Sequence, residues 1–313
     1  MKQTVKNRLY HNFKKGLKLI IKILVRLPGK SLVIMIIAKL LDVLIRFGID
    51  IRILGKYLQK FTSIKLVEEL NPMIKVQTKR GELLFSCPGY LPFWRSQTLL
   101  TKEPETIEWI DNFDDNSVLW DIGANIGIYS LYAGLNESTQ IFAFEPASFN
   151  YNILNENIRN NSFDNRIHAL NIAFCDQQGI NHLYISDSKA GSAHHSFGEP
   201  RDELGKSFRE IFCQAVIGFK IDDFITEMGI DFPNYLKIDV DGIEHIILAG
   251  AEQTLKDNRV KSILVELDAG RKELYANTVD FIKYCGFKLD KRVLYPRSRN
   301  IDCEIYNNIF YRY

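Results

Sequence analysis

The chain has 313 residues, of which 46% are hydrophobic and 25% charged, a composition that fits one globular catalytic domain with an extension. Its five cysteines are scattered, odd in number and without a CxxC pair, which argues against a disulfide framework and fits a reducing cytoplasm. The net charge of +2 hides an asymmetry, because residues 1–60 hold 14 Lys or Arg against two Asp, or +12, which leaves −10 for the rest.

The extension is apolar as well as basic. Lys14, Lys18, Lys22 and Arg26 recur every four residues with aliphatic residues between them, and Pro28 ends the segment. This spacing predicts a basic amphipathic helix.

A second apolar segment, residues 31–49, contains three central charges at Lys39, Asp42 and Arg46. Its apolar residues contribute roughly −4 to −7 kcal/mol to insertion, whereas the charges cost roughly 7 to 10, so a membrane span is disfavoured. The three charges fall on one helical stripe, which suits a helix lying in the interface. We therefore expect residues 14–49 to dock on an anionic membrane surface, at the cytoplasmic face.

Other readings of the extension remain open. Its helices can pack on the catalytic domain or mediate self-association, with the lysines solvated. Nucleic acid is disfavoured, because interleaved aromatic residues are missing and the rest of the chain is acidic. A cleaved signal peptide is disfavoured by the charges that interrupt the apolar run.

Residues 61–100 lead into the core. Short strand-like runs over 64–86 surround a hairpin turn at 79–82, and residues 87–95 read as a loop rich in aromatics. That loop can serve as a lid or acceptor surface, although packing of a linker onto the sheet is the plainer reading.

A glycine-rich turn follows the apolar run 118–120. Residues 121–127 read Asp-Ile-Gly-Ala-Asn-Ile-Gly and precede a run of helical periodicity. Gly123 and Gly127 permit positive φ and close approach to a ligand, while the helix N-terminus offers N–H groups to an anion. Asn125 stands where the Gly-x-Gly-x-x-Gly of dinucleotide enzymes has glycine, which counts against a nicotinamide cofactor. Together with Asp121, the turn predicts a nucleotide-like ligand.

Acidic residues close several later strands. Glu145 follows the run 141–144 at the interval where a second strand presents a carboxylate to ribose hydroxyls. Asp239 follows the run 235–238, and Glu266 follows the run 262–265. Ligands of open α/β sheets bind outside the carboxyl ends of the strands, so Asp121, Glu145, Asp239 and Glu266 should line one crevice.

These blocks, in this order, resemble the FkbM-type methyltransferases, a branch of the class I S-adenosylmethionine-dependent enzymes. The matching blocks are DIGANIG from residue 121, FEP from residue 144 with Asn150 after it, LKIDVDGIEHIILAGAEQTL from residue 236 and ILVELD from residue 263. The resemblance covers about residues 101–289 and leaves out residues 1–60. It implies a Rossmann-like α/β fold over 101–313, with a seven-stranded, mostly parallel sheet, helices on both faces and an antiparallel terminal strand.

The resemblance also implies O-methylation of a hydroxyl on a sugar or secondary metabolite, including a lipid-linked one. S-adenosylmethionine would be held by Gly123, Asn125 and Gly127, with Glu145 on the ribose and Asp239 facing the sulfonium and the acceptor. Asp121 and Asn150 complete the predicted cofactor set. Asp241 stands where the family more often has Glu, so its shorter reach leaves its role open.

A sugar hydroxyl benefits from a general base, for which we rank Asp239 first. Glu266 is a second candidate, and His194 and His195 lie in a polar loop that can cover the acceptor. His245 sits in the first turn of a helix, where a protonated imidazole is disfavoured, and is expected to be structural.

No metal is expected. Asp239 and Asp241 can offer carboxylates to Mg²⁺, but alternation along a strand would point them to opposite faces, and no His or Cys group has zinc spacing. Two alternatives to a methyltransferase remain at this stage: a non-catalytic scaffold or sensor of the same fold, and a nicotinamide-dependent oxidoreductase.

Overall fold

The computed structural model describes residues 63–65, 70, 72–193, 195–200, 207–294 and 304–313. The chain divides into two units, residues 1–71 and 72–313. Of the first unit, the description covers a helical turn at 63–65 and Leu70, so the helices predicted over 14–26 and 31–49 lie outside the described residues.

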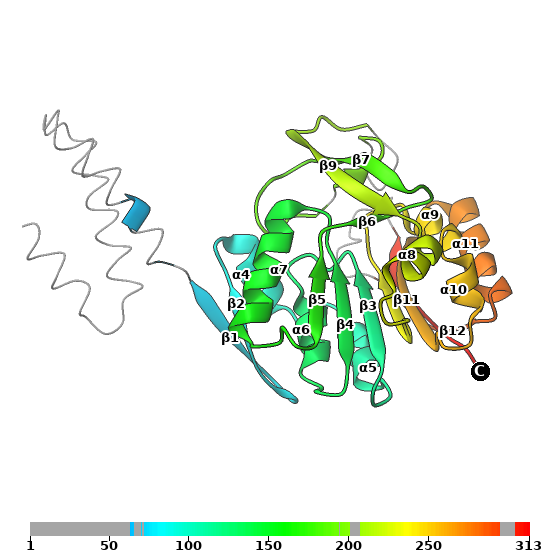
Figure 1. Ribbon diagram of the computed structural model, residues 1–313, viewed down its shortest axis with the longest axis horizontal. Helices are drawn as coiled ribbons and strands as arrows, with labels where there is room; N and C mark the ends of the chain where they lie inside the picture. The colour runs from blue at the N-terminus through cyan, green and yellow to red at the C-terminus, as the bar shows by residue number, and fades with distance from the viewer. Residues whose placement is uncertain (1–62, 66–69, 71, 194, 201–206, 295–303) are drawn as a thin grey trace, which may run out of the picture. The chain divides into compact units, whose positions relative to one another are not determined.

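A seven-stranded sheet forms the centre of the second unit, with the order β12-β13-β11-β10-β3-β4-β5 (Figure 1). Its members are β3 (Val118–Ile122), β4 (Gln140–Phe144), β5 (Ile167–Leu170), β10 (Tyr235–Ile238), β11 (Ser262–Asp268), β12 (Lys288–Leu294) and β13 (Ile305–Tyr311). The strands β3, β4, β5, β10 and β11 pair in parallel, whereas β13 runs antiparallel to both β11 and β12. The predicted Rossmann-like fold, with its antiparallel last strand, is confirmed.

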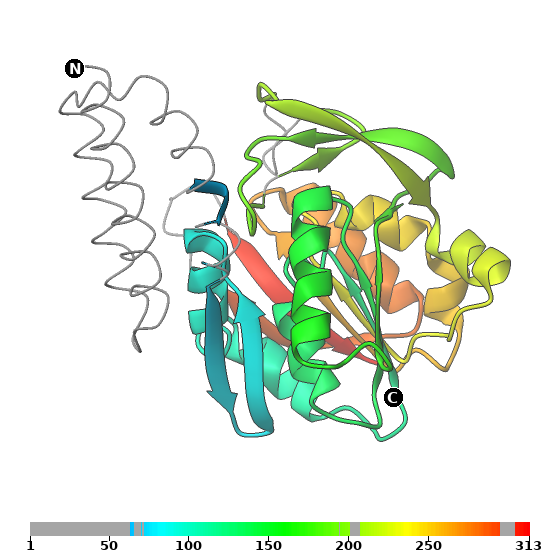
Figure 2. The same cartoon turned by 60° about the vertical axis from the view of Figure 1, so that its left-hand side comes forward.

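Alternate residues of each strand divide the core between the two faces of the sheet. Leu119, Ile141 and Leu264 pack on one face, while Trp120 and Phe142, their neighbours in sequence, pack on the other. The first face is covered by α5 (Pro104–Asp111), α6 (Ile128–Gly134) and α7 (Ser148–Asn160). The second face is covered by α8 (Ile221–Met228), α9 (Glu244–Ala249), α10 (Glu252–Lys256) and α11 (Lys272–Tyr284). Figure 2 shows α7 lying along the first face.

The segment before the main sheet contains the predicted hairpin. The strands β1 (Met73–Thr78) and β2 (Gly81–Ser86) pair antiparallel around a turn at residues 79 and 80. The loop predicted over 87–95 is wrong in its second half, because α4 spans Tyr90–Gln97. Pro92 lies in the first turn of α4, where a missing N–H and a fixed φ are tolerated.

A second, four-stranded sheet was not predicted. It has the order β6-β9-β7-β8 and is built from β6 (Ala173–Phe174), β7 (Gly179–Ile185), β8 (Ser196–Phe197) and β9 (Phe212–Phe219). This sheet lies over the carboxyl-terminal edge of the main sheet (Figure 1). Sequence periodicity did not reveal it, because one face of β7 and β9 is exposed yet carries apolar residues such as Ile180 and Ile217.

No helix in the described part of the chain is long and apolar enough to cross a membrane.

The central strand β10 should dominate the stability of this unit. Leu236 is fully buried on the second face, so Leu236→Ala should lower the free energy of unfolding by about 2–5 kcal/mol. Ile180→Ala, at a site that is 80% exposed, should change it by less than about 0.5 kcal/mol. Urea denaturation followed by circular dichroism measures both, and equal midpoints for the two variants would contradict this account of the core.

Candidate active site

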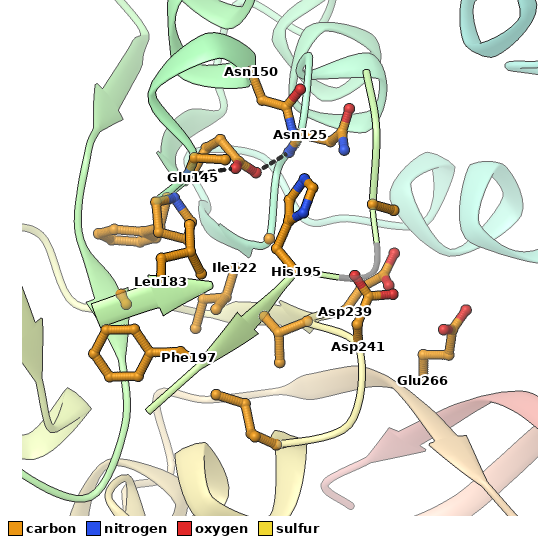
Figure 3. Close-up of a pocket in the computed structure, with 18 of the residues that line it drawn as sticks. Ile122, Asn125, Glu145, Asn150, Leu183, His195, Phe197, Asp239, Asp241 and Glu266 are labelled. Atoms are coloured by element: carbon orange, nitrogen blue, oxygen red, sulfur yellow. Dashed lines mark hydrogen bonds between the residues drawn. The ribbon is translucent and has the colours of Figure 1, made fainter. Parts of the chain in front are cut away.

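A cavity of 320 Å³ opens at the carboxyl ends of β3, β4, β10 and β11. Its size lies at the lower end of the range for small-molecule sites. One end is apolar, with walls from Phe144, Ile172, Phe174, Leu183 and Phe197. At the other end stand Asp239, Asp241 and Glu266, and Glu145 lies beside Asn125, above Leu183 in the view of Figure 3. The cavity therefore offers an apolar compartment, an acidic end and a separate carboxylate at Glu145.

Gly123 allows the turn after β3 to approach the end of β10. Its φ is +83°, and a Cβ there would lie 1.9 Å from the backbone oxygen of Asp239. Gly127 has a φ of +82° and caps α6; a Cβ there would lie 2.4 Å from Leu154 Cδ1. Gly123 lines the cavity but Gly127 does not. Both glycines are thus required by close packing within the protein.

Glu145 is held by the backbone. Its two carboxylate oxygens accept N–H groups of Asn125 at 2.8 Å and Ala147 at 2.9 Å. The Asn150 side chain adds a third hydrogen bond, which leaves the carboxylate capacity to accept from a ligand hydroxyl. Burial raises the pKa of Glu145 to about 7, against the lowering effect of the two N–H donors.

Asn125 and Asn150 anchor residues 186–193, here called the roof loop. Both side-chain amides donate to the carbonyl of Ser192, at 2.9 and 3.0 Å, and the Asn150 side-chain oxygen accepts the Gly191 N–H at 2.8 Å. Both asparagines also line the cavity. The two asparagines, predicted to bind the cofactor, therefore line the cavity and also hold the roof loop in place.

Asp121 lies beneath the cavity. It is 1% exposed, it accepts a 2.5 Å hydrogen bond from the Ser130 hydroxyl, and its other oxygen is 3.8 Å from the Lys237 ammonium. It is absent from the cavity wall. Burial raises the pKa of Asp121, while Lys237 and Ser130 lower it. Any effect of Asp121 on a ligand passes through its neighbours.

Lys237 is one of the residues near this site that the sequence analysis did not single out. Its side chain is 2% exposed, and its ammonium lies 2.9 Å from Asp239 Oδ2 and 5.2 Å from the Tyr129 ring centre. Lysine is almost never fully buried unless it is paired. A lysine inside the apolar run of β10 was the signal in the sequence.

Asp239 and Glu266 face the same end of the cavity in different charge environments. Asp239 is 27% exposed, and Lys237, Lys102 and Arg95 lower its pKa against the opposing effect of burial. Burial, followed by the charges of Asp239 and Glu103, raises the pKa of Glu266 well above its usual value. Glu266 lies within β11, which continues to Asp268, and does not follow the strand as expected.

Asp241 lines the cavity together with Asp239. The expectation that they point to opposite faces is wrong, because β10 ends at Ile238 and both residues belong to the following turn, where Asp241 has a φ of +63°. In the described part of the chain, no group of three or more His, Cys, Asp or Glu side chains is arranged to hold a metal.

Residues that precede β3 in the chain also line the cavity. Trp94 and Arg95 of α4 and Lys102 line the cavity, although none was predicted as a site residue. Arg95 Nε donates to the Gly191 carbonyl at 2.7 Å, and Lys102 forms a 2.6 Å ion pair with buried Glu103. Residues 87–95 were predicted to form a loop, and a loop gives no basis for predicting which of its side chains face the sheet. The helix α4 turns Trp94 and Arg95 towards the cavity.

The three candidate histidines differ in their position relative to the cavity. His195 lines the cavity, with Nε2 3.2 Å from the Ser192 hydroxyl. His194 lies outside the described residues. His245 is absent from this cavity's wall and lines a smaller one beside it, where burial lowers its pKa.

Comparison with known proteins identifies the family. Residues 121–289, more than half of the chain, match the family model described as the methyltransferase FkbM domain. The chain is a member of the FkbM methyltransferase family. Its cofactor is S-adenosylmethionine.

Two relatives of this FkbM family member have similar sequences. The hexuronic acid methyltransferase AglP of Haloferax volcanii is 23% identical over 220 residues, which are 67% of this chain and 84% of that protein. The 31-O-demethyl-FK506 methyltransferase FkbM of Streptomyces tacrolimicus is 27% identical over 174 residues, which are 48% of this chain and 65% of that protein.

Two solved structures are similar to this chain at lower sequence identity. The precorrin-6y C5,15-methyltransferase of Geobacter metallireducens superposes with a TM-score of 0.40 at 13% identity, covering 67% of this chain and 87% of that chain. TYW2 of Pyrococcus horikoshii, in complex with MeSAdo, has a TM-score of 0.42 at 10% identity, covering 78% of this chain and 73% of that chain.

The cavity fits S-adenosylmethionine. Its apolar compartment suits an adenine ring, Glu145 has remaining capacity to accept from a ribose hydroxyl, and the acidic end suits a positive sulfonium. The Glu145 carboxylate is already bonded and needs no rearrangement to accept this hydroxyl.

Ligand binding should follow the titration of Glu145. Below a pH of about 7 its carboxyl group is protonated and loses acceptor capacity. The affinity for S-adenosylhomocysteine should therefore rise between pH 6 and pH 8 in the wild-type protein, and Glu145→Gln should bind more weakly without this rise. Isothermal titration calorimetry across the pH range measures both effects.

His195 provides the control, because its ionisable imidazole lines the same cavity. His195→Gln should keep the pH dependence. If that variant abolishes it while Glu145→Gln does not, the assignment to Glu145 is wrong.

Proposed function

We propose that this methyltransferase transfers its methyl group to a hydroxyl oxygen of a saccharide or other hydroxylated metabolite, including lipid-linked ones. The observation that carries the proposal is the acidic end of the cavity, formed by Asp239, Asp241 and Glu266 (Figure 3). Carboxylates accept hydrogen bonds from hydroxyls, so this end suits a polyhydroxylated acceptor. One relative is named for a hexuronic acid and another for the 31-O position of demethyl-FK506, which agrees with an oxygen acceptor.

The protein contributes alignment and charge. S-adenosylmethionine supplies an activated methyl group on a positively charged sulfur. Glu145 and the roof loop orient the bound ligand, while Asp239 and Glu266 face the place where an acceptor hydroxyl must lose its proton. Alignment of donor and acceptor accounts for much of the acceleration in such a displacement, and a positioned base adds roughly 10²–10⁴-fold.

Methyl transfer tests the proposal directly. The wild-type protein should move labelled methyl from S-adenosylmethionine to a saccharide fraction, free or lipid-linked, prepared from cells that lack the gene. Asp239→Asn should bind S-adenosylhomocysteine yet lose transfer by about 10²-fold or more. Asp164→Asn, at an exposed position remote from the cavity wall, should be fully active.

Two outcomes would count against the proposal. Binding of S-adenosylhomocysteine without transfer to any hydroxylated fraction would support a non-catalytic sensor of the same fold. Transfer that survives in Asp239→Asn at the wild-type rate would remove Asp239 from the acceptor site. The family match already favours a methyltransferase over a nicotinamide-dependent oxidoreductase.

We also propose that the basic extension brings the enzyme to the inner face of the cytoplasmic membrane. Support comes from the sequence: residues 1–60 carry +12, with four basic residues in one row at 14, 18, 22 and 26. Each basic residue near an anionic surface contributes about 1 kcal/mol to docking.

Liposome flotation tests this membrane role. The full chain should float with anionic phosphatidylglycerol vesicles and not with neutral phosphatidylcholine vesicles, and glutamate at Lys14, Lys18, Lys22 and Arg26 should abolish flotation. A matched control places glutamate at four exposed lysines of the second unit, namely Lys75, Lys272, Lys283 and Lys288. Equal flotation of the two variants would remove the extension from membrane binding.

A further inference from the structure

The buried ammonium of Lys237 lies directly behind a carboxylate of the cavity wall. Its Nζ is 2.9 Å from Asp239 Oδ2, and its side chain is 2% exposed. We propose that Lys237 is a positioning residue of the methyltransferase centre, which holds the Asp239 carboxylate as a fixed anion facing the sulfonium of the cofactor. The inference rests on the proposed function, in which Asp239 faces the reacting atoms.

The strand register places the Lys237 ammonium between two carboxylates, those of Asp121 and Asp239. Lys237 on β10 is the register partner of Asp121 on β3, and Asp239 lies two residues beyond it. Asp121 is already bonded to Ser130, and its nearer oxygen lies 3.8 Å from the ammonium, against 2.9 Å for Asp239. The Tyr129 ring covers another side of the ammonium. The shortest ionic contact therefore points towards the cavity.

Charged groups from every surrounding element act on Asp239. Lys237 of β10 lies behind it, and Arg95 of α4 and Lys102 add positive charge from the side of the cavity. Negative charge comes from Asp121 of β3, Glu244 of α9 and Glu266 of β11, and Asp241 lies next to Asp239 in the cavity wall (Figure 3). Without Lys237, a partly buried carboxylate would face these four acidic groups with Arg95 and Lys102 as the remaining cations, and its proton affinity would rise.

A carboxylate that stays ionised can face a positive sulfonium and is also free to accept the proton of an acceptor hydroxyl. An aspartate bonded to a buried ammonium has a pKa below its usual range, so it carries its charge where the sulfonium binds. Lys237 does not line the cavity, so it acts through Asp239. Without Lys237, the preference of the protein for a positively charged ligand over a neutral one should depend on pH.

Two cofactor analogues measure this recognition. S-adenosylhomocysteine has a neutral sulfur at the reacting position, whereas sinefungin carries an ammonium nearby. In the wild-type protein, the ratio of the two affinities should stay constant from pH 6 to pH 8. In Lys237→Met, the preference for sinefungin should fall by about tenfold at pH 6 and recover towards pH 8, as Asp239 loses its proton.

Two further variants separate charge from packing. Lys237→Arg keeps the buried charge and should keep a constant ratio, whereas Asp239→Asn should show the reduced preference at every pH. A packing role alone would weaken both ligands equally in Lys237→Met at all pH values, and that result would overturn the proposal. If the wild-type protein binds neither analogue, the cofactor site itself is misassigned and both proposals fail.

A measurement on the wild-type protein covers the case in which Lys237→Met does not fold. Carbon-13 spectra of aspartate carboxyl groups, with Asp239 assigned by comparison with Asp239→Asn, report its titration. The carboxyl signal should titrate below the usual aspartate pKa of about 3.9. A pKa at or above that value would overturn the proposal.

Discussion

One buried ion cluster lies where the two halves of the sheet meet. The Lys237 ammonium on β10 lies between Asp121 of the neighbouring strand β3 and Asp239 at the cavity wall. Isolated charges cannot be buried without a large desolvation cost, so each member depends on the others, and loss of one partner costs about 3–5 kcal/mol. The cluster therefore couples the register of the central strands to the charge presented to the ligand.

The glycine-rich turn serves the architecture as much as the ligand. Gly123 makes room for the Asp239 backbone, Gly127 for Leu154, and Asn125 bonds the roof loop as well as lining the cavity. The turn thus joins β3, β10, α7 and the roof loop into one rigid support. A ligand that enters meets groups already held by the protein, which lowers the ordering cost of binding.

The cavity wall draws on segments outside the family match. Trp94, Arg95 and Lys102 precede residue 121, and Ile305 follows residue 289, yet all four line the cavity. The matched segment supplies Gly123, Glu145, Asp239 and Glu266. The matched segment can keep a common cofactor site while the residues outside it differ between proteins. Proteins of one fold can therefore differ in the compounds that they accept.

The sequence alone determined the parallel α/β fold, the hairpin and the acidic strand ends, because apolar runs, turn glycines and strand-terminal carboxylates are local patterns whose order resembles a known family. Only the tertiary structure decided that Asp121 lies beneath the cavity, that Asn125 and Asn150 share one carbonyl, and that Lys237 lies behind Asp239. It also revealed the second sheet and the turn of α4 towards the site. These features depend on contacts between residues far apart in the chain, which no local pattern encodes.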